Sequence, residues 1–442
     1  MKHLLLSVCL VLGFLGTSSG MEKKVDISGR IIYRGRWYDL DFDKDNKLSS
    51  LNRQNWFGNL SLTLKFSPTE HVRGCFELSR TIYGIGNYGD LEVNPQLRDE
   101  VGDKPLRLPP PYTEDEQWEM SLMQAWGEVD LPLPWPASVR IGKQPLKLGE
   151  NGLYLNTYPN RTFALVGKAE LPYIKLQAGA VKLYEGIRAK EPNDDANIYY
   201  LKAKRKLGGQ CFSVFGAYFE DASGPDTAGV VKSSYNLGVA VEGRLAVLKY
   251  KTEFGYLWGK DKVDTDVAGY FFMARICCPK GHGFLEFGWG SGDDPTTADK
   301  IEAYLPPGPF YPYAWAYEYR FIHWRWNSSR FGRHTQAMME PLAPGLEATI
   351  YAKVGLNWKL PRWRLSGQEA LIYLGHLEGY NPADTDKFST FGYEIDSVIN
   401  CKLYKNFSYQ FILGYVIPGD YVKDMTPGDP AWGIRSQFVF NF

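Results

Sequence analysis

Apolar and polar residues alternate with a period of two along most of the chain, which is the pattern of β-strands with one apolar and one polar face. The last segment shows it clearly, because Trp432, Ile434, Phe438, Phe440 and Phe442 fall on one face. Arginine, glutamine and asparagine fall on the other face. An apolar strand left at a sheet edge invites aggregation, and pairing it with the first strand removes that edge. The pattern therefore predicts a closed, antiparallel, all-β barrel.

Two kinds of connection take turns between the predicted strands. Short connections rich in proline or glycine alternate with long, polar, acidic ones, as in transmembrane barrels with short periplasmic turns and long extracellular loops. We predict about eighteen strands, with sixteen as the alternative count. They lie near 25–38, 59–66, 72–83, 118–131, 138–148, 163–170, 173–184, 198–206, 211–220, 234–242, 247–258, 267–277, 284–290, 346–359, 363–374, 389–403, 407–416 and 431–442.

Residues 1–20 have the features of a secretory signal peptide, namely a charged start, an apolar run from Leu4 to Leu15, and small residues up to Gly20. No later stretch reaches the ~18 consecutive apolar residues of a transmembrane helix, so strands are the remaining way to cross a membrane. We expect one barrel domain over 21–442. We expect it to be a monomer surrounded by lipid of the bacterial outer membrane.

The composition supports a wall that is apolar on one side and wet on the other. Mean hydropathy is −0.32 and aromatic residues make up 15% of the chain, which suits strands bordered by aromatic girdles. Lysine and arginine number 50 and aspartate and glutamate 50; without Lys2 of the leader the balance is 49 to 50, a net charge of −1. This balance gives no reason to expect nucleic acid as a partner. The cysteines form no metal-binding or disulfide pattern.

The polar faces of the strands would line the lumen of the barrel. The first, third and fifth strands supply several arginines, whose planar guanidinium groups hold carboxylates well. The alternative for each residue is that charges of both signs pair and only keep the wall wet. The lumen candidates are Arg30, Arg34, Arg36, Arg73, Glu77, Arg140, Gln144, Lys249, Lys251, Glu253, Glu347, Lys353, Glu394, Asp396 and Arg435.

The longest predicted loop, 291–344, has an unusual aromatic and basic composition. Aromatic rings stack on flat apolar faces and arginines bind carboxylates, so we expect this loop to fold into the lumen as a constriction. A position on the outer rim is the alternative. The constriction candidates are Trp315, Arg320, Trp324, Arg325, Trp326, Arg330 and Arg333.

Signals for a metal or for enzyme chemistry are weak. Asp41, Asp43 and Asp45 resemble the start of a calcium-binding loop, but Asn46 replaces the usual glycine, so a solvated acidic loop is the favoured interpretation. There is no H-E-x-x-H motif and no G-x-S-x-G motif. We expect no cofactor and no enzymatic activity, with a hydrolase built on the barrel wall as the alternative.

Several short segments resemble the alginate-export family. They are Gln124-Ala-Trp-Gly-Glu-Val-Asp-Leu, Arg140-Ile-Gly-Lys-Gln144, Gly290-Ser-Gly-Asp-Asp294 and Ile32-Tyr-Arg34-Gly-Arg36. Lys143 stands where that family commonly has arginine. The resemblance implies an eighteen-stranded outer-membrane channel.

Together these observations predict a channel for passive passage of polar or anionic solutes. The solute would be an anionic polysaccharide such as alginate, leaving the cell, or its fragments entering. A terminal Phe442 also resembles the signal read by the barrel-assembly machinery, which we expect as a partner. The alternatives are a general porin, a structural barrel plugged by its loops, and a secreted all-β protein that binds or cleaves carbohydrate.

Overall fold

A computed structural model describes residues 24–39, 52–84, 121–157, 162–184, 195–222, 231–293, 297, 299–307, 349–377, 388–423 and 428–442. Eighteen long antiparallel strands form one closed ring, in the order of the chain. They are β1 (Lys24–Asp39), β2 (Asn52–Thr69), β3 (Val72–Gly84), β4 (Ser121–Asp130), β5 (Ala137–Gln144), β8 (Thr162–Glu170), β9 (Lys175–Tyr184), β10 (Ala196–Leu207), β11 (Gln210–Asp221), β12 (Val231–Leu245), β13 (Leu248–Asp261), β14 (Asp266–Cys277), β15 (Gly283–Gly290), β17 (Thr349–Leu360), β18 (Leu365–Leu377), β19 (Phe388–Lys402), β20 (Phe407–Pro418) and β21 (Ala431–Asn441).

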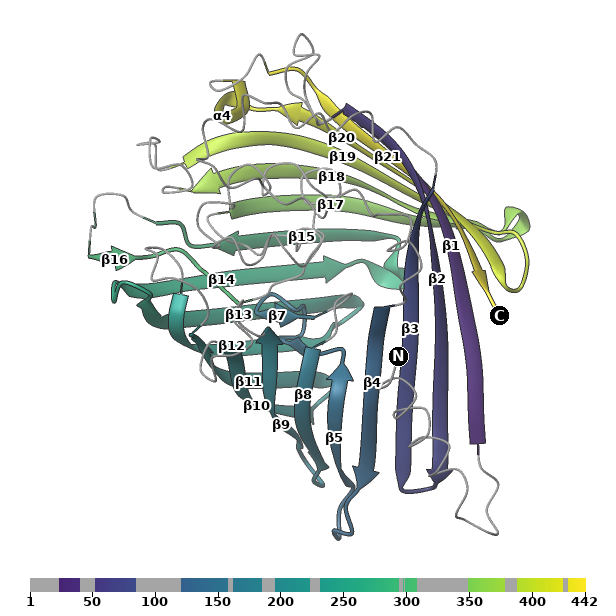
Figure 1. Cartoon of the computed structure of the whole chain (residues 1–442). Helices are drawn as coiled ribbons and strands as arrows, with labels where there is room; N and C mark the ends of the chain where they lie inside the picture. The colour runs from purple at the N-terminus through teal and green to yellow at the C-terminus, as the bar shows by residue number, and fades with distance from the viewer. Residues whose placement is uncertain are drawn as a thin grey trace, which may run out of the picture.

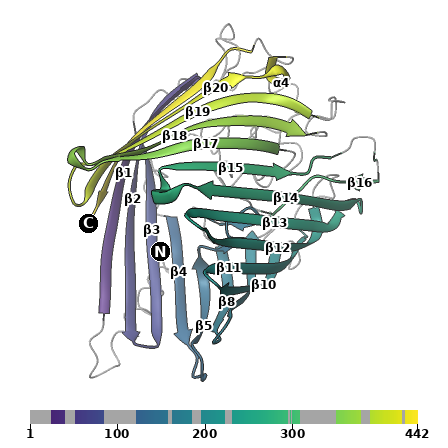
Figure 2. The ribbon, with the colours of Figure 1, turned by 180° about the vertical axis from the view of Figure 1, so that it is seen from behind.

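The ring closes between the first and last strands, which lie side by side in Figures 1 and 2. β1 and β21 pair antiparallel from Arg30 opposite Asn441 to Asp39 opposite Trp432. This closure leaves no open edge. The predicted fold class and the count of eighteen strands are confirmed, and the signal peptide and the calcium candidates Asp41, Asp43 and Asp45 lie outside the described residues.

The described residues also include several minor elements, among them two 3-10 turns, η2 (Pro279–Gly281) and η4 (Pro361–Trp363). β6 (Lys147–Leu148) and β7 (Leu155–Asn156) form a small hairpin, and β16 (Lys300–Ile301) pairs in parallel with β14. A short helix, α4 (Asp420–Lys423), follows β20. No helix in the described ranges is long and apolar enough to cross a membrane.

The two ends of the barrel differ. Short turns join β2 to β3, β4 to β5, β8 to β9 and the later pairs at one end, and the long connections all lie at the other end. In outer-membrane barrels the short turns face the periplasm.

The outer face of the wall is apolar. Ile27, Ile141, Leu201 and Leu356 are between 58% and 63% exposed. Exposed aliphatic side chains that alternate with inward polar ones are what a lipid-facing wall requires.

Candidate functional site: the lumen

The strand register places the predicted lumen residues on the inner face. Arg34 pairs with Gln437 and Arg30 with Asn441, while the intervening Ile31 and Tyr33 are exposed on the outer face. The backbone position of Arg36 lies opposite Arg435 on the same inner face. By the same alternation Arg73, Glu77, Arg140, Gln144, Lys249, Lys251, Glu253, Lys353, Glu394 and Asp396 also occupy inner positions.

Some of these inner charges are paired with a neighbour on the wall. The guanidinium of Arg140 donates from Nη2 to Glu128 Oε2 at 2.6 Å and lies 3.8 Å from the centre of the Trp126 ring. Arg73 forms an ion pair with Asp130. These two arginines therefore add little net charge to the lumen.

Gln144 is buried and is hydrogen-bonded within the wall. It is 2% exposed, and its side-chain amide donates to the carbonyl oxygen of Ala164 at 2.9 Å. The chain leaves the wall directly after it, since β5 ends there. The predicted strand near 138–148 therefore extends too far: residues 145 and 146 are not strand, and Lys147–Leu148 form the separate strand β6, which pairs with β7 and not with the wall.

The segment 145–157, which we call the inner hairpin, fills one side of the lumen. Its base is closed by hydrogen bonds in both directions between Leu146 and Thr157, with N–O distances of 2.9 Å and less. Leu148, Leu153 and Tyr154 are completely buried. They belong to one apolar cluster with inward residues of the wall, including Phe215, Leu257, Phe271 and Met273. Figure 1 shows β7 of this hairpin inside the ring of long strands.

Two polar contacts fix the tip of the inner hairpin. Glu150 forms ion pairs with Lys202 at 2.9 Å and Lys204 at 3.1 Å, both on β10. Asn151 donates from its backbone N–H and its side-chain amide to Glu253 on β13. Burial alone would raise the pKa of Glu150, but hydrogen bonds and charges from Lys202 and Lys204 lower it to about 2. The hairpin is thus held by an apolar core and by ionised groups.

The start of the long loop after β15 also lies inside the barrel. Tyr304 is completely buried, and its ring centroid is 4.8 Å from that of Phe271. Ser291 secures this segment, because its hydroxyl donates to the carbonyl oxygen of Glu302 at 2.7 Å. The predicted constriction residues Trp315, Arg320, Trp324, Arg325, Trp326, Arg330 and Arg333 of the same loop lie outside the described residues, as does Glu347.

These insertions make the lumen asymmetric. Val166, Ile198 and Phe219, inward residues of β8, β10 and β11, are at most 5% exposed. On the opposite wall burial is uneven, because Arg30 and Asn441 are exposed whereas Gln437 is 7% exposed and Glu394 is completely buried. The accessible inner surface on this side therefore lies toward the short-turn end of β1, β2 and β21, and we refer to the inner face of β1, β2 and β19 to β21 as the open wall.

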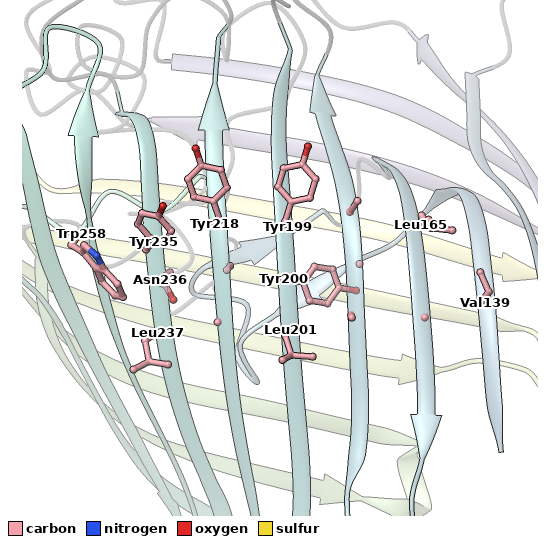
Figure 3. A pocket seen from close by; sticks show the side chains of 16 residues that line it. Val139, Leu165, Tyr199, Tyr200, Leu201, Tyr218, Tyr235, Asn236, Leu237 and Trp258 are labelled. Carbon is pink, nitrogen blue, oxygen red and sulfur yellow. The ribbon is translucent and has the colours of Figure 1, made fainter. Parts of the chain in front are cut away.

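A hollow in the described surface lies on the outer face of the barrel. It measures about 850 Å³ and is floored by small residues, including Gly167, Ala178 and Gly216. A row of aromatic side chains borders it, and Figure 3 shows Tyr199, Tyr218, Tyr235 and Trp258 side by side on successive strands. Such a row marks the level of the lipid headgroups. This hollow faces lipid and is separate from the solute path.

Sequence reasoning missed the inner hairpin, whereas the predicted constriction in loop 291–344 stays a prediction. The available signal was the alternation of Leu146, Leu148, Leu153 and Leu155 around a polar tip flanked by Gly149 and Gly152. Both glycines have positive φ angles, 79° and 80°, which fit a tight reversal. This pattern indicates a short hairpin within the loop, with strands too short to cross the membrane.

No protein-family model matches the chain, and no curated protein matches it in sequence. Solved structures are similar. OccK1 (OpdK) of Pseudomonas aeruginosa has a TM-score of 0.55 and 10% identity over 94% of this chain and 98% of its own. OccAB3 of Acinetobacter baumannii has a TM-score of 0.56 and 11% identity over 94% and 99%. A BenF-like porin from Pseudomonas fluorescens has a TM-score of 0.58 and 10% identity over 95% and 98%.

At this identity the likeness concerns the fold, and the fold is that of bacterial outer-membrane porins. Together with the apolar outer face and its aromatic row, it assigns the barrel to the bacterial outer membrane, as predicted. The resemblance to the alginate-export family is not confirmed by these comparisons. The alternative of a secreted soluble protein does not fit a wall whose outer face exposes large apolar side chains such as Ile27, Ile141, Leu201 and Leu356.

Proposed function

We propose that this barrel is a channel for passive diffusion of small anions across the outer membrane. The observation that carries the proposal is the charge of the open wall. The inner-face positions of β19, β20, β21, β1 and β2 hold eight basic residues and three acidic residues, Asp26, Glu394 and Asp396. The basic ones are Lys24, Arg30, Arg34, Arg36, Arg53, Lys65, Lys402 and Arg435.

Such a wall attracts anions and replaces part of their hydration. A carboxylate that enters from outside exchanges water for guanidinium N–H donors, which are arranged along the path rather than gathered at one point. Several weak sites in series allow the solute to leave as easily as it enters. The inner hairpin narrows the path from the opposite side. The chemistry requires no cofactor.

The similar structures support an anionic solute. They include OpdK of Pseudomonas aeruginosa with vanillate, a carboxylate, and the BenF-like porin. Export of an anionic polysaccharide such as alginate, or uptake of its fragments, remains a prediction that these comparisons do not support. Conductance measurements distinguish the proposal from its two alternatives, a general porin and a loop-plugged barrel.

The test measures reversal potentials of single channels in planar bilayers across a KCl gradient. We expect anion preference in the wild type and its loss when Arg30, Arg34 and Arg435 are all changed to alanine. The matched control is Glu128→Ala with Arg140→Ala, which removes a neutral pair from the inner wall and should leave the reversal potential near that of the wild type. Absence of conductance in a folded wild-type barrel, or cation preference, would contradict the proposal.

A further inference from the structure

A row of uncharged amides continues the arginine wall toward one end of the barrel. Arg34 donates from Nε to Gln437 Oε1 at 2.9 Å, and Gln437 donates from Nε2 to Gln410 Oε1 at 2.8 Å. Gln410 in turn donates from Nε2 to Asn400 Oδ1 at 2.7 Å. Each member sits directly opposite the next across adjacent strands. We call Gln437, Gln410 and Asn400 the amide row.

The amide row descends along the wall. Arg34 lies in the middle of β1, whereas Asn400 lies almost at the end of β19, beside the short turn that leads to β20. Neighbouring strands are ~4.8 Å apart, so the row from Arg34 to Asn400 spans roughly 14 Å. It leads from the arginines at mid-lumen to the periplasmic mouth, on the open side of the lumen.

The row has hydrogen-bonding capacity left over. An amide NH₂ group carries two hydrogens and a carbonyl oxygen accepts two bonds. Gln410 Oε1 already accepts from both Gln437 and Arg435, the latter at 3.1 Å, and Gln410 Nε2 uses one of its two hydrogens in the bond to Asn400, which leaves the second hydrogen for a solute. Asn400 keeps both hydrogens of its NH₂ group and one acceptor site. Both side chains are partly exposed.

Other uncharged polar side chains occupy the inner face around the row. They are Ser28, Ser61, Thr63, Ser408 and Asn441. Around the row, the periplasmic half of the open wall therefore presents neutral donors and acceptors beside the charges of Asp26, Arg30 and Lys65. A carboxylate only accepts hydrogen bonds, whereas a hydroxyl group both donates and accepts, so the amide row suits hydroxyl groups better than a second anionic group.

We infer that the solute is a small polyhydroxylated carboxylate, whose hydroxyl groups bind the amide row while its carboxylate is held at Arg34 and Arg435. This inference rests on the proposed function and narrows its substrate class. It differs from an anion channel with an inert polar wall, in which the amides only keep the surface wet and charge alone decides the rate.

The experiment compares permeation of gluconate and hexanoate, two six-carbon monoanions that differ in their hydroxyl groups, into proteoliposomes and as currents in bilayers. We expect wild-type channels to pass gluconate faster than hexanoate when each rate is compared with free diffusion of a solute of that size. Gln410→Leu and Asn400→Leu keep similar volume and remove the amide, so each should lower the gluconate-to-hexanoate ratio roughly five-fold, the effect of one hydrogen bond. Selectivity for chloride over potassium should be retained in Asn400→Leu, because Asn400 is hydrogen-bonded to Gln410 and not to an arginine.

The matched control is Gln368→Leu. Gln368 is an inner-face amide on β18 that donates to Asn357 Oδ1 at 2.8 Å, outside the amide row. Its loss should leave the ratio unchanged. A wild-type gluconate-to-hexanoate ratio at or below that of free diffusion overturns the inference. An unchanged ratio in both Gln410→Leu and Asn400→Leu overturns it as well, provided that both variants migrate on gels as folded barrels. If the wild type shows no anion preference at all, the proposed function has failed; if it prefers anions without distinguishing the two acids, only the inference has failed.

Discussion

Asn151 donates two hydrogen bonds to one carboxylate oxygen, Glu253 Oε2, from its backbone N–H and from its side-chain amide, each at 2.7 Å. Glu253 is 1% exposed and Asn151 is 5% exposed, so this contact is a buried latch between the tip of the inner hairpin and β13. The two residues are far apart in sequence, and the latch exists only once the barrel has closed around the hairpin.

Replacing Glu253 with leucine should release the tip of the hairpin. Two buried donors on Asn151 would lose their acceptor, at a cost of about 1–3 kcal/mol each. We expect a lower unfolding temperature in detergent and a larger single-channel conductance with more current noise. Glu253→Gln retains a carbonyl oxygen that can accept both bonds and should stay close to the wild type. Equal conductance for the leucine variant and the wild type would show that the apolar cluster alone fixes the constriction.

Substitution of Gly149 provides a second test of the contact between Asn151 and Glu253. Its φ is +79°, and an added Cβ would lie 2.2 Å from Glu253 Oε1. Gly149→Ala should therefore disturb the carboxylate as well as strain the backbone, and raise conductance as the leucine variant does. Gly208 in the turn between β10 and β11 also has positive φ, +53°, but nothing lies within 4 Å of an added Cβ. Gly208→Ala should show only the backbone strain of about 1–2 kcal/mol and a normal conductance.

The sequence predicted the wall because each strand carries its own signal. A period of two requires only the strand itself, so each of the eighteen predicted ranges overlaps one observed strand of the wall, for example 211–220 against Gln210–Asp221. The bounds were less accurate for the second strand, predicted near 59–66 and observed at Asn52–Thr69. The inner positions of the arginines follow from the same alternation.

The partners of those arginines could not be predicted from alternation. Whether an inner arginine is neutralised depends on the register between neighbouring strands. Arg140 lies opposite Glu128, whereas Arg34 lies opposite Gln437, which connects it to the amide row. The contact between Asn151 and Glu253 is even harder to predict from the sequence, because it depends on how a loop folds into a space that exists only after the barrel has closed.

Glu150 should make the hairpin tolerant of mild acid. Its pKa is lowered from 4.5 to about 2 in the folded protein. A carboxyl whose pKa falls on folding stabilises the folded state above its unfolded pKa, and that contribution, about 3 kcal/mol, is lost as the pH falls from about 4.5 to about 2. Wild-type conductance should stay constant from pH 7 to pH 5.

Comparison with Glu150→Gln isolates this group from other carboxyls. The difference in unfolding temperature between wild type and Glu150→Gln should be large at pH 7 and shrink steadily below pH 4.5. A difference that is the same at pH 3 and pH 7 would mean that the ion pairs with Lys202 and Lys204 contribute nothing to holding the hairpin.

The seam of the barrel offers a separate test of the C-terminal residue. Gly29 donates its N–H to Phe442 O at 2.8 Å, and Phe442 donates its N–H to Gly29 O at 3.0 Å. The Phe442 ring covers Gly29 so closely that an added Cβ would lie 2.2 Å from the ring carbon Cζ. The terminal residue thus contributes both backbone bonds and a lipid-facing ring to the closure.

Phe442→Ala separates these two contributions. The variant keeps both backbone bonds, so its purified barrel should unfold within a few degrees of the wild type when heated in detergent. Deletion of Phe442 removes both bonds and should lower the unfolding temperature further, since each is worth about 1 kcal/mol. If the aromatic ring is also the signal read by the assembly machinery, Phe442→Ala should reduce the amount of barrel in the outer membrane of cells despite its normal stability. Equal amounts of the alanine variant and the wild type would restrict the role of Phe442 to closing the seam.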